Sequence, residues 1–105
     1  MPSTEKAFQR KVLQYLRERG GWWRKMSPLP YGHTGDPDII GCYHGVFVSI
    51  ELKAPGKYKD PEKGATALQK EVLDDIALCG GVTLVVDSLE PIIQELDSLD
   101  RVHLW

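Results

Sequence analysis

The sequence of 105 residues contains few cysteines and no long apolar segment. Its two cysteines, Cys42 and Cys79, can form at most one bridge, so a disulfide scaffold is not expected. No apolar run approaches the ~18 residues that span a bilayer, and the first residues lack the apolar stretch of a signal peptide. We therefore expect a cytoplasmic protein with reduced thiols and no membrane association.

Several common site patterns are missing as well. The sequence contains no internal repeat, P-loop, Ser-His-Asp arrangement or dinucleotide fingerprint, so no small-molecule cofactor is expected. Cys42, His44, Cys79 and His103 do not have the paired spacing of a structural zinc site.

What is present fits one globular domain over residues 1–105. Hydrophobic residues make up 42% of the chain and charged residues 27%, which is typical of a globular protein. Residues 1–70 carry 12 Lys and Arg against 7 Asp and Glu, whereas residues 71–105 carry only Arg101 against 8 acids. Such an asymmetry indicates either a positive face for a polyanion or solvated helices that differ in sign. Composition alone does not decide between them.

The apolar pattern predicts an α/β domain with the element order α-β-β-β-α-β-α and a mixed sheet. The first helix is capped by Ser3 or Thr4 and ends at Gly20-Gly21. Strands are expected over 22–26, 38–43 and 46–53, the last two joined by a tight turn at His44-Gly45. The first helix shows helical spacing of the apolar residues Phe8, Val12, Tyr15 and Leu16.

The second half of the chain predicts two helices around one more strand. A helix over 65–79 carries Leu68, Val72 and Ile76 on one stripe, and 82–86 is expected to be a buried central strand. Ser88 is expected to cap a last helix that ends near Leu99. Residues 102–105 are expected to form a short strand or a packed tail.

One constellation carries chemistry. In a hairpin centred on His44-Gly45, Asp38 at the start of one strand lies beside the end of the other. Glu51 and Lys53 point to the same face, because side-chain direction repeats every two residues. Two carboxylates and one ammonium therefore converge at one end of the sheet.

Charges next to Val and Ile strand residues indicate a partly buried ionic site, which must be paired or hold a metal. Carboxylates are oxygen ligands suited to Mg²⁺ or Mn²⁺, and a lysine beside such a metal suits phosphodiester hydrolysis. The alternative is a surface salt bridge between Lys53 and Asp38 or Glu51.

These motifs resemble a known family. Gly35-Asp-Pro-Asp38 followed by Ile50-Glu-Leu-Lys53 is similar to the PD-(D/E)XK nuclease superfamily, and the chain resembles the stand-alone VRR-NUC domains of phages and bacteria. The resemblance implies a restriction-endonuclease-like αβββαβ core in which a mixed central sheet is flanked by helices. It covers about residues 3–88 and includes the segments Ser3-Thr-Glu5, 35–41, 51–56, Leu68-Gln69 and 80–86.

The resemblance also implies roles for individual residues. Asp38 and Glu51 would be metal ligands with the backbone carbonyl of Leu52, and Lys53 would be the catalytic lysine. Glu5 matches the acid of the first helix, which reaches the metal directly or through water, and Gln69 would hold Lys53 or the phosphate backbone. The spacing of Glu5, Phe8 and Val12 also turns Glu5 toward the core. The alternatives are a helix-dipole acid for Glu5 and an ordinary surface glutamine for Gln69.

The function implied is a metal-dependent DNA endonuclease acting on structured DNA, above all on four-way (Holliday) junctions. Flaps, forks or plain duplex are alternative substrates, and a non-catalytic junction-binding module is an alternative function. A homodimer is expected because a junction has two-fold symmetry, in a bacterial cell or a phage-infected host.

The cations that could contact phosphates include Arg10, Lys11, Arg17, Arg24 and Lys25. The preferred candidates for DNA contacts lie in two loops. Lys57, Lys59 and Lys63 follow the predicted site strand, and His33 lies in the loop before Asp38. The alternatives are a solvated charged loop and a turn-shaping histidine. Trp22 and Trp23 are expected in the core and on the dimer surface.

Overall fold

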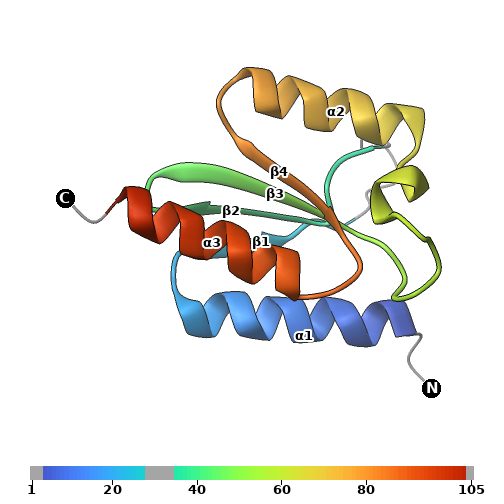
Figure 1. Cartoon of the computed structure of the whole chain (residues 1–105), viewed down its shortest axis with the longest axis horizontal. Helices are drawn as coiled ribbons and strands as arrows, with labels where there is room; N and C mark the ends of the chain where they lie inside the picture. The colour runs from blue at the N-terminus through green and yellow to red at the C-terminus, as the bar shows by residue number, and fades with distance from the viewer. Residues whose placement is uncertain (1–3, 28–34, 104–105) are drawn as a thin grey trace.

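The structure is a computed structural model that describes residues 4–27 and 35–103. Figure 1 shows a sheet with helices on both faces. The elements in chain order are α1 (Thr4–Arg19), β1 (Trp22–Lys25), β2 (Ile39–Tyr43), β3 (Val46–Leu52), the 3-10 helix η1 (Pro61–Gly64), α2 (Ala67–Leu78), β4 (Val82–Val86) and α3 (Glu90–Val102). The predicted α/β class, element order and mixed sheet are confirmed.

The sheet has the strand order β1-β2-β3-β4. β1, β2 and β3 pair antiparallel, and β4 pairs parallel to β3. The β2–β3 turn is formed by His44 and Gly45, whose φ angles of 51° and 78° are the pair of positive values typical of a tight hairpin turn. This turn sets the register in which Ile39 pairs with Ile50.

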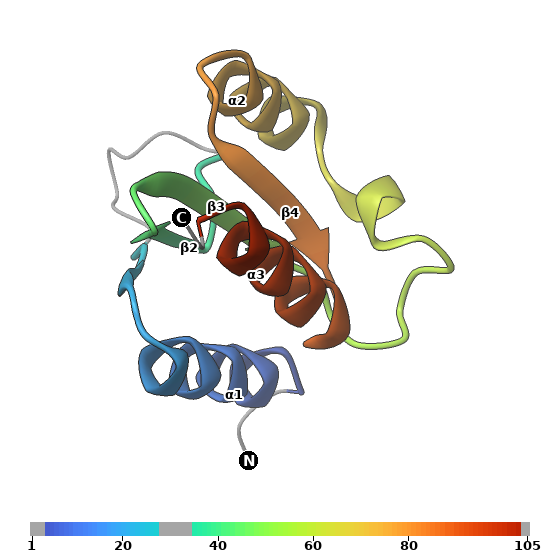
Figure 2. The same cartoon turned by 60° about the vertical axis from the view of Figure 1, so that its left-hand side comes forward.

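The main core lies between the sheet and the pair α1 and α3, while α2 covers part of the opposite face (Figure 1 and Figure 2). Val48 and Ile50 of β3 point into this core and are fully buried. Trp23 lies across the backbone of Gly41 on the neighbouring strand, where an added Cβ would stand 2.1 Å from the ring. Only glycine therefore leaves room for this indole.

Two expectations about buried elements are wrong. β4 was expected to be central, but within the described residues it is an edge strand in which Val86 is buried and Val82–Val85 are partly exposed. β4 has a continuous apolar run because α2 lies near one of its faces and α3 near the other. Both faces therefore need apolar side chains, whether the strand is central or at an edge.

The apolar stripe of α2 is displaced from the expected one. Leu73 is buried and Leu68 is 51% exposed, so the face turned to the sheet contains Gln69 in place of Leu68. Gln69, Leu73 and Ile76 lie at i, i+4 and i+7, which is the spacing of one helix face.

The last helix also differs from expectation. Leu89 precedes α3, and Ser88 does not cap it. Val102 belongs to the helix, so the strand or tail expected over 102–105 is wrong at that residue. Residues 104–105 lie outside the described part of the chain. Ser3, the other candidate cap of the first helix, also lies outside it. Within residues 4–27 and 35–103, no helix is long and apolar enough to cross a bilayer.

Candidate active site

The candidate site lies at the end of the sheet where β2 begins and β3 ends, which we call the site end. α1 and α2 also begin at this end, and β4 ends here because it runs parallel to β3. Asp38 stands just before β2, and one of its carboxylate oxygens accepts a hydrogen bond of 2.7 Å from the Leu52 backbone N–H. The hairpin thus brings Asp38 to the end of β3, as its spacing predicts.

Glu51 lies beneath the first turn of α2. Its side chain is on the face of β3 opposite the main core, and only 4% of the residue is exposed. Oε1 accepts a 2.9 Å hydrogen bond from Nε2 of Gln69. Oε2 is buried and has no hydrogen-bond partner among the described residues. A buried carboxylate oxygen without a donor is unfavourable unless a ligand completes it.

Gln69 links the site residues to the start of α2. Its Oε1 accepts hydrogen bonds from Lys53 Nζ at 2.9 Å and from the Thr66 backbone N–H at 2.8 Å. The Thr66 hydroxyl in turn accepts from the Gln69 backbone N–H at 3.1 Å, which completes a capping box. Two donors face the amide oxygen and a carboxylate faces the amide nitrogen, so this network fixes the orientation of the amide.

The charges of the site are not balanced. Lys53 Nζ lies 3.7 Å from Glu51 Oε1, and the two side chains are 12% and 5% exposed. Burial and the nearby Asp38 carboxylate raise the pKa of Glu51 to about 8, although Lys53 acts in the opposite direction. In the absence of a cation Glu51 therefore keeps its proton at neutral pH, because the single ammonium does not offset the two carboxylate charges.

This donor set fits a hard divalent cation. Asp38 and Glu51 supply carboxylate oxygens, including the one without a partner, and Leu52, which directly follows Glu51, adds a backbone carbonyl. The part of the chain that the structure describes contains no cluster of three or more His, Cys, Asp or Glu side chains arranged for a metal. Mg²⁺ is commonly bound by one or two carboxylates, with water molecules completing its coordination shell.

A cavity of about 420 Å³ opens beside Asp38 and Leu52, and neither Glu51 nor Lys53 is among its lining residues. It is lined by Asp38 and Leu52, by Lys25 and Met26 at the end of β1, and by Glu5, Lys6 and Gln9 of α1. Glu5 was expected to turn inward with the core, but it is exposed because the first turn of α1 reaches the rim of this cavity. Glu5 shares the cavity with Asp38 but is not grouped with both carboxylates as a third metal-binding side chain.

The expected DNA contacts that the structure describes are exposed to solvent. Lys57, Lys59 and Lys63 are exposed, Lys63 in η1 and the other two in the loop before it. His33 lies outside the described residues. Trp23 is buried in the core, as expected, whereas Trp22 is 52% exposed with the Arg24 guanidinium 5.0 Å from its ring centre.

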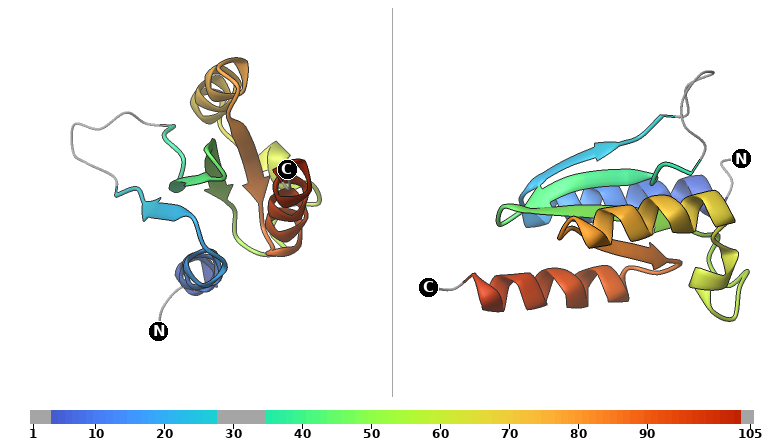
Figure 3. Two further views of the ribbon diagram at one scale, coloured as in Figure 1. Left: turned by 90° about the vertical axis from the view of Figure 1, so that its left-hand side faces the viewer. Right: turned by 90° about the horizontal axis from the view of Figure 1, so that it is seen from above.

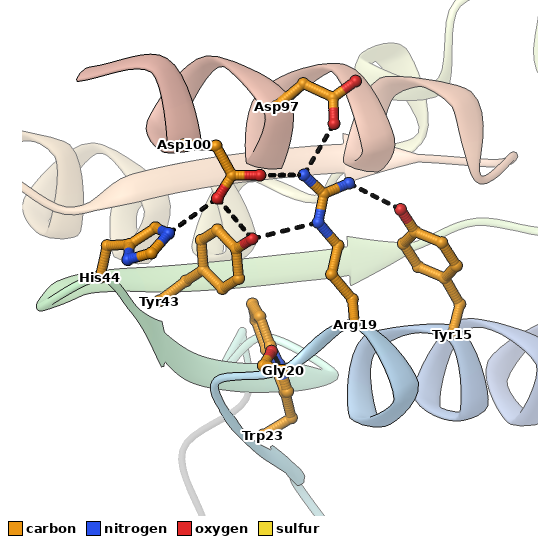
Figure 4. Close-up of polar contacts among 8 residues, drawn as sticks. All are labelled: Tyr15, Arg19, Gly20, Trp23, Tyr43, His44, Asp97 and Asp100. Carbon is orange, nitrogen blue, oxygen red and sulfur yellow. Dashed lines mark hydrogen bonds and ion pairs between the residues drawn. The ribbon is translucent and has the colours of Figure 1, made fainter. Parts of the chain in front are cut away.

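Two features were missed in the sequence. The pattern Thr66-x-x-Gln69 is a capping-box signature that predicts the start of α2 two residues later than expected. The second is a polar cluster at the opposite end of the sheet, the hairpin end (Figure 4). It has no sequence signal, because Arg19 and its partner Asp100 are 81 residues apart.

In the hairpin-end cluster, Arg19 is paired with two aspartates. Its guanidinium lies 2.7 Å from Asp97 and 2.6 Å from Asp100, while its Nε donates to the Tyr43 hydroxyl at 3.1 Å. Asp100 also accepts from the Tyr43 hydroxyl and lies 2.7 Å from His44 Nε2. These contacts join the end of α1, the hairpin turn and the end of α3 (Figure 4).

Comparison with models of known protein families finds no match to this chain, and no curated protein sequence matches it significantly.

Proposed function

We propose that the chain is a metal-dependent DNA endonuclease that hydrolyses phosphodiester bonds, with Asp38, Glu51 and Lys53 as its catalytic residues. The observation that carries the proposal is the buried Glu51 oxygen without a partner, next to Asp38 and to a lysine held by hydrogen bonds. A structural salt bridge would be expected to satisfy both carboxylates, and this arrangement leaves one oxygen for a ligand.

The residues divide the work as follows. Asp38, Glu51 and the Leu52 carbonyl would hold Mg²⁺ or Mn²⁺, which when bound supplies charge neutralisation and activation of water for attack on phosphorus. Lys53 Nζ stabilises the charge that develops on the phosphate. Gln69 keeps both Lys53 and Glu51 in place, and Glu5 orders water at the rim of the cavity.

The fold and the substrate enter the proposal through the resemblance to VRR-NUC domains. The observed order α1-β1-β2-β3-α2-β4 agrees with a restriction-endonuclease-like core, which supports the membership without establishing it. From the same resemblance we propose branched DNA, four-way junctions first, as the substrate. A homodimer would match the two-fold symmetry of a junction.

The test is cleavage of a labelled panel containing a four-way junction, a flap, a fork, a duplex and a single strand, with Mg²⁺, Mn²⁺ or EDTA. Metal-dependent cleavage of the junction at symmetric positions is expected. Asp38→Asn is a suitable control, because the amide oxygen still accepts the Leu52 N–H while the charge is lost.

The possible outcomes separate the alternatives. Cleavage of flaps, forks or duplex in preference to the junction would keep the site and change the substrate. Junction binding without cleavage in any metal would replace the enzyme with a non-catalytic binding module. Full activity of the Asp38→Asn protein would contradict the site itself.

A further inference from the structure

The charges of the chain separate onto the two edges of the sheet. Residues 4–27, which form α1 and β1, contain seven Lys and Arg against Glu5 and Glu18. Residues 67–103, which form α2, β4 and α3, contain eight acids against Lys70 and Arg101. β1 and β4 are the two outer strands of the described sheet, so β1 and the α2–β4 unit lie at opposite edges (Figure 3). α3 packs on the same face as α1, where its Asp97 and Asp100 pair with Arg19. Between β1 and the α2–β4 unit, the asymmetry seen in the sequence is therefore an asymmetry of the surface.

Basic side chains line two hollows along α1, the first of them at the candidate site, and we call this set the basic flank. It consists of Lys6, Arg10, Arg17 and Lys25. Lys6 and Lys25 line the cavity that also contains Asp38, and Arg10 and Arg17 line a second hollow of about 430 Å³ farther along α1. Arg10 and Arg17 are seven positions apart, which places them on one side of the helix.

Three cations of the basic flank are open to solvent. Arg10, Arg17 and Lys25 are exposed, and none of the three forms an ion pair with an acid of the described chain. Three acids, Glu5, Asp38 and Glu18, line the same two hollows as the four cations of the flank, which leaves a net positive charge of one. Arg19, by contrast, is already saturated by Asp97 and Asp100.

We propose that the basic flank binds the phosphodiester backbone of the DNA that enters the candidate site. The proposal rests on the proposed function in taking DNA as the substrate. Lys6 and Arg17 are separated by about 16 Å along the helix axis, a length over which one strand of duplex carries about five phosphates. The acidic edge around β4 repels the same backbone and so favours one orientation of the bound DNA.

The structure favours this flank over the loop that the sequence suggested. Lys57, Lys59 and Lys63 alternate with Asp60 and Glu62, which lowers the net charge of that loop. η1, where the loop leads, contacts β4 on the acidic side of the sheet. The backbone of a long DNA therefore follows α1 away from the site, toward Arg17.

The test measures the salt dependence of binding to a fluorescently labelled DNA four-way junction in EDTA, where no cleavage occurs. The variant Arg10→Ala/Arg17→Ala is compared with Lys70→Ala/Arg101→Ala, which removes the same charge from α2 and α3. Each lost phosphate contact reduces the slope of log K against log salt concentration by about 0.9. We expect the flank variant to lose about two units of slope and the control variant to keep the slope of the unmodified protein.

Equal slopes for the two variants, or no measurable binding by the unmodified protein, would overturn the basic flank as a DNA site. Its failure is distinguishable from failure of the proposed function. A protein that cleaves DNA with an unchanged slope in the flank variant is a nuclease that binds elsewhere. A protein that binds through the flank and cleaves nothing keeps this inference and loses the enzymatic one.

Discussion

The two ends of the sheet differ in the burial and the partners of their charged side chains. At the hairpin end, Arg19 has two aspartate partners and a tyrosine, and its side chain is 15% exposed. At the site end, Lys53 lies 3.7 Å from Glu51, Asp38 accepts from a backbone N–H, and a buried Glu51 oxygen has no partner among the described residues. Both clusters place two carboxylates near one cation. The side chains of the aspartates at the hairpin end are 49% and 40% exposed, whereas the Glu51 side chain, which carries the oxygen without a partner, is 5% exposed.

The difference indicates what each end is for. The hairpin-end cluster holds α1, α3 and the hairpin together, and its loss is a loss of stability. At the site end, a bound cation would stabilise the carboxylates and give the buried Glu51 oxygen a partner. Natural proteins keep buried polar groups without partners mainly at functional sites. The comparison therefore predicts that variants at the two ends separate activity from stability.

The largest expected effect is on cleavage. Lys53→Met removes the ammonium while keeping an unbranched side chain, and we expect activity to fall by roughly two to three orders of magnitude, since a positioned charge at the phosphate is lost. Circular dichroism should show an unchanged fold. Wild-type cleavage rates in this variant would mean that the lysine only balances charge.

The next effect should appear at the hairpin end. Arg19→Met leaves two aspartates without their partner, and we expect the free energy of unfolding to fall by about 2 kcal/mol, less than for a fully buried pair because both aspartates are partly exposed to water. Urea unfolding measures the loss. Cleavage per folded molecule should be unchanged, and a proportional loss of cleavage would show that the two ends are not independent.

A change of similar size and opposite sign is expected for Glu51→Gln without metal. The raised pKa of Glu51 means that the folded state holds a proton that the unfolded state has lost, so stability decreases as the pH rises from 4.5 to about 8. The substituted glutamine carries no charge and can still accept from Gln69, so this variant should be more stable than the unmodified protein by on the order of 2 kcal/mol at pH 8. The gain should vanish below pH 4.5, and a gain that is the same at every pH would contradict the assignment.

Thr66 should contribute through Gln69. Thr66→Val removes the acceptor of the Gln69 N–H, and we expect a loss of about 1 kcal/mol in stability and about tenfold in kcat with little change in KM. Thr66→Ser keeps the hydroxyl and should restore both values. Equal kcat in the valine and serine variants would limit Thr66 to capping the helix.

The smallest effect is the acid sensitivity of the hairpin end. Hydrogen bonds from Tyr43, His44 and Arg19 lower the pKa of Asp100 to about 2, so its stabilising contribution is present above 3.8 and is lost as the pH falls toward 2. Asp100→Asn should flatten this part of the stability profile. A profile identical to that of the unmodified protein would show that Asp100 does not titrate with folding.

Local patterns were enough to predict the hairpin and its end. The positive φ angles at His44 and Gly45 fix a register in which Asp38 must lie beside the end of β3, so the Asp38–Glu51–Lys53 arrangement follows from spacing. The place of β4 did not follow, because an apolar run looks the same in an edge strand and a central one when helices lie on both faces.

Other features depend on the assembled fold. Gln69 faces the sheet because the buried face of α2 differs from the expected one. Arg19 is paired with Asp100 because the end of α3 lies beside the hairpin. The basic flank required knowing that β1 and β4 are opposite edges. The sequence shows that the two halves of the chain differ in net charge, but composition does not tell where these charges lie on the surface.

The most direct test of the account is the effect of Mn²⁺ on thermal unfolding of three proteins: the unmodified chain, Asp38→Asn/Glu51→Gln and Asp97→Asn/Asp100→Asn. A cation that binds only the folded state raises the unfolding temperature in proportion to its occupancy. We predict an increase for the unmodified chain and for the Asp97/Asp100 variant, and none for the Asp38/Glu51 variant. An equal increase in all three proteins, or none in any, would contradict the claim that the carboxylates at the site end are built for a divalent cation.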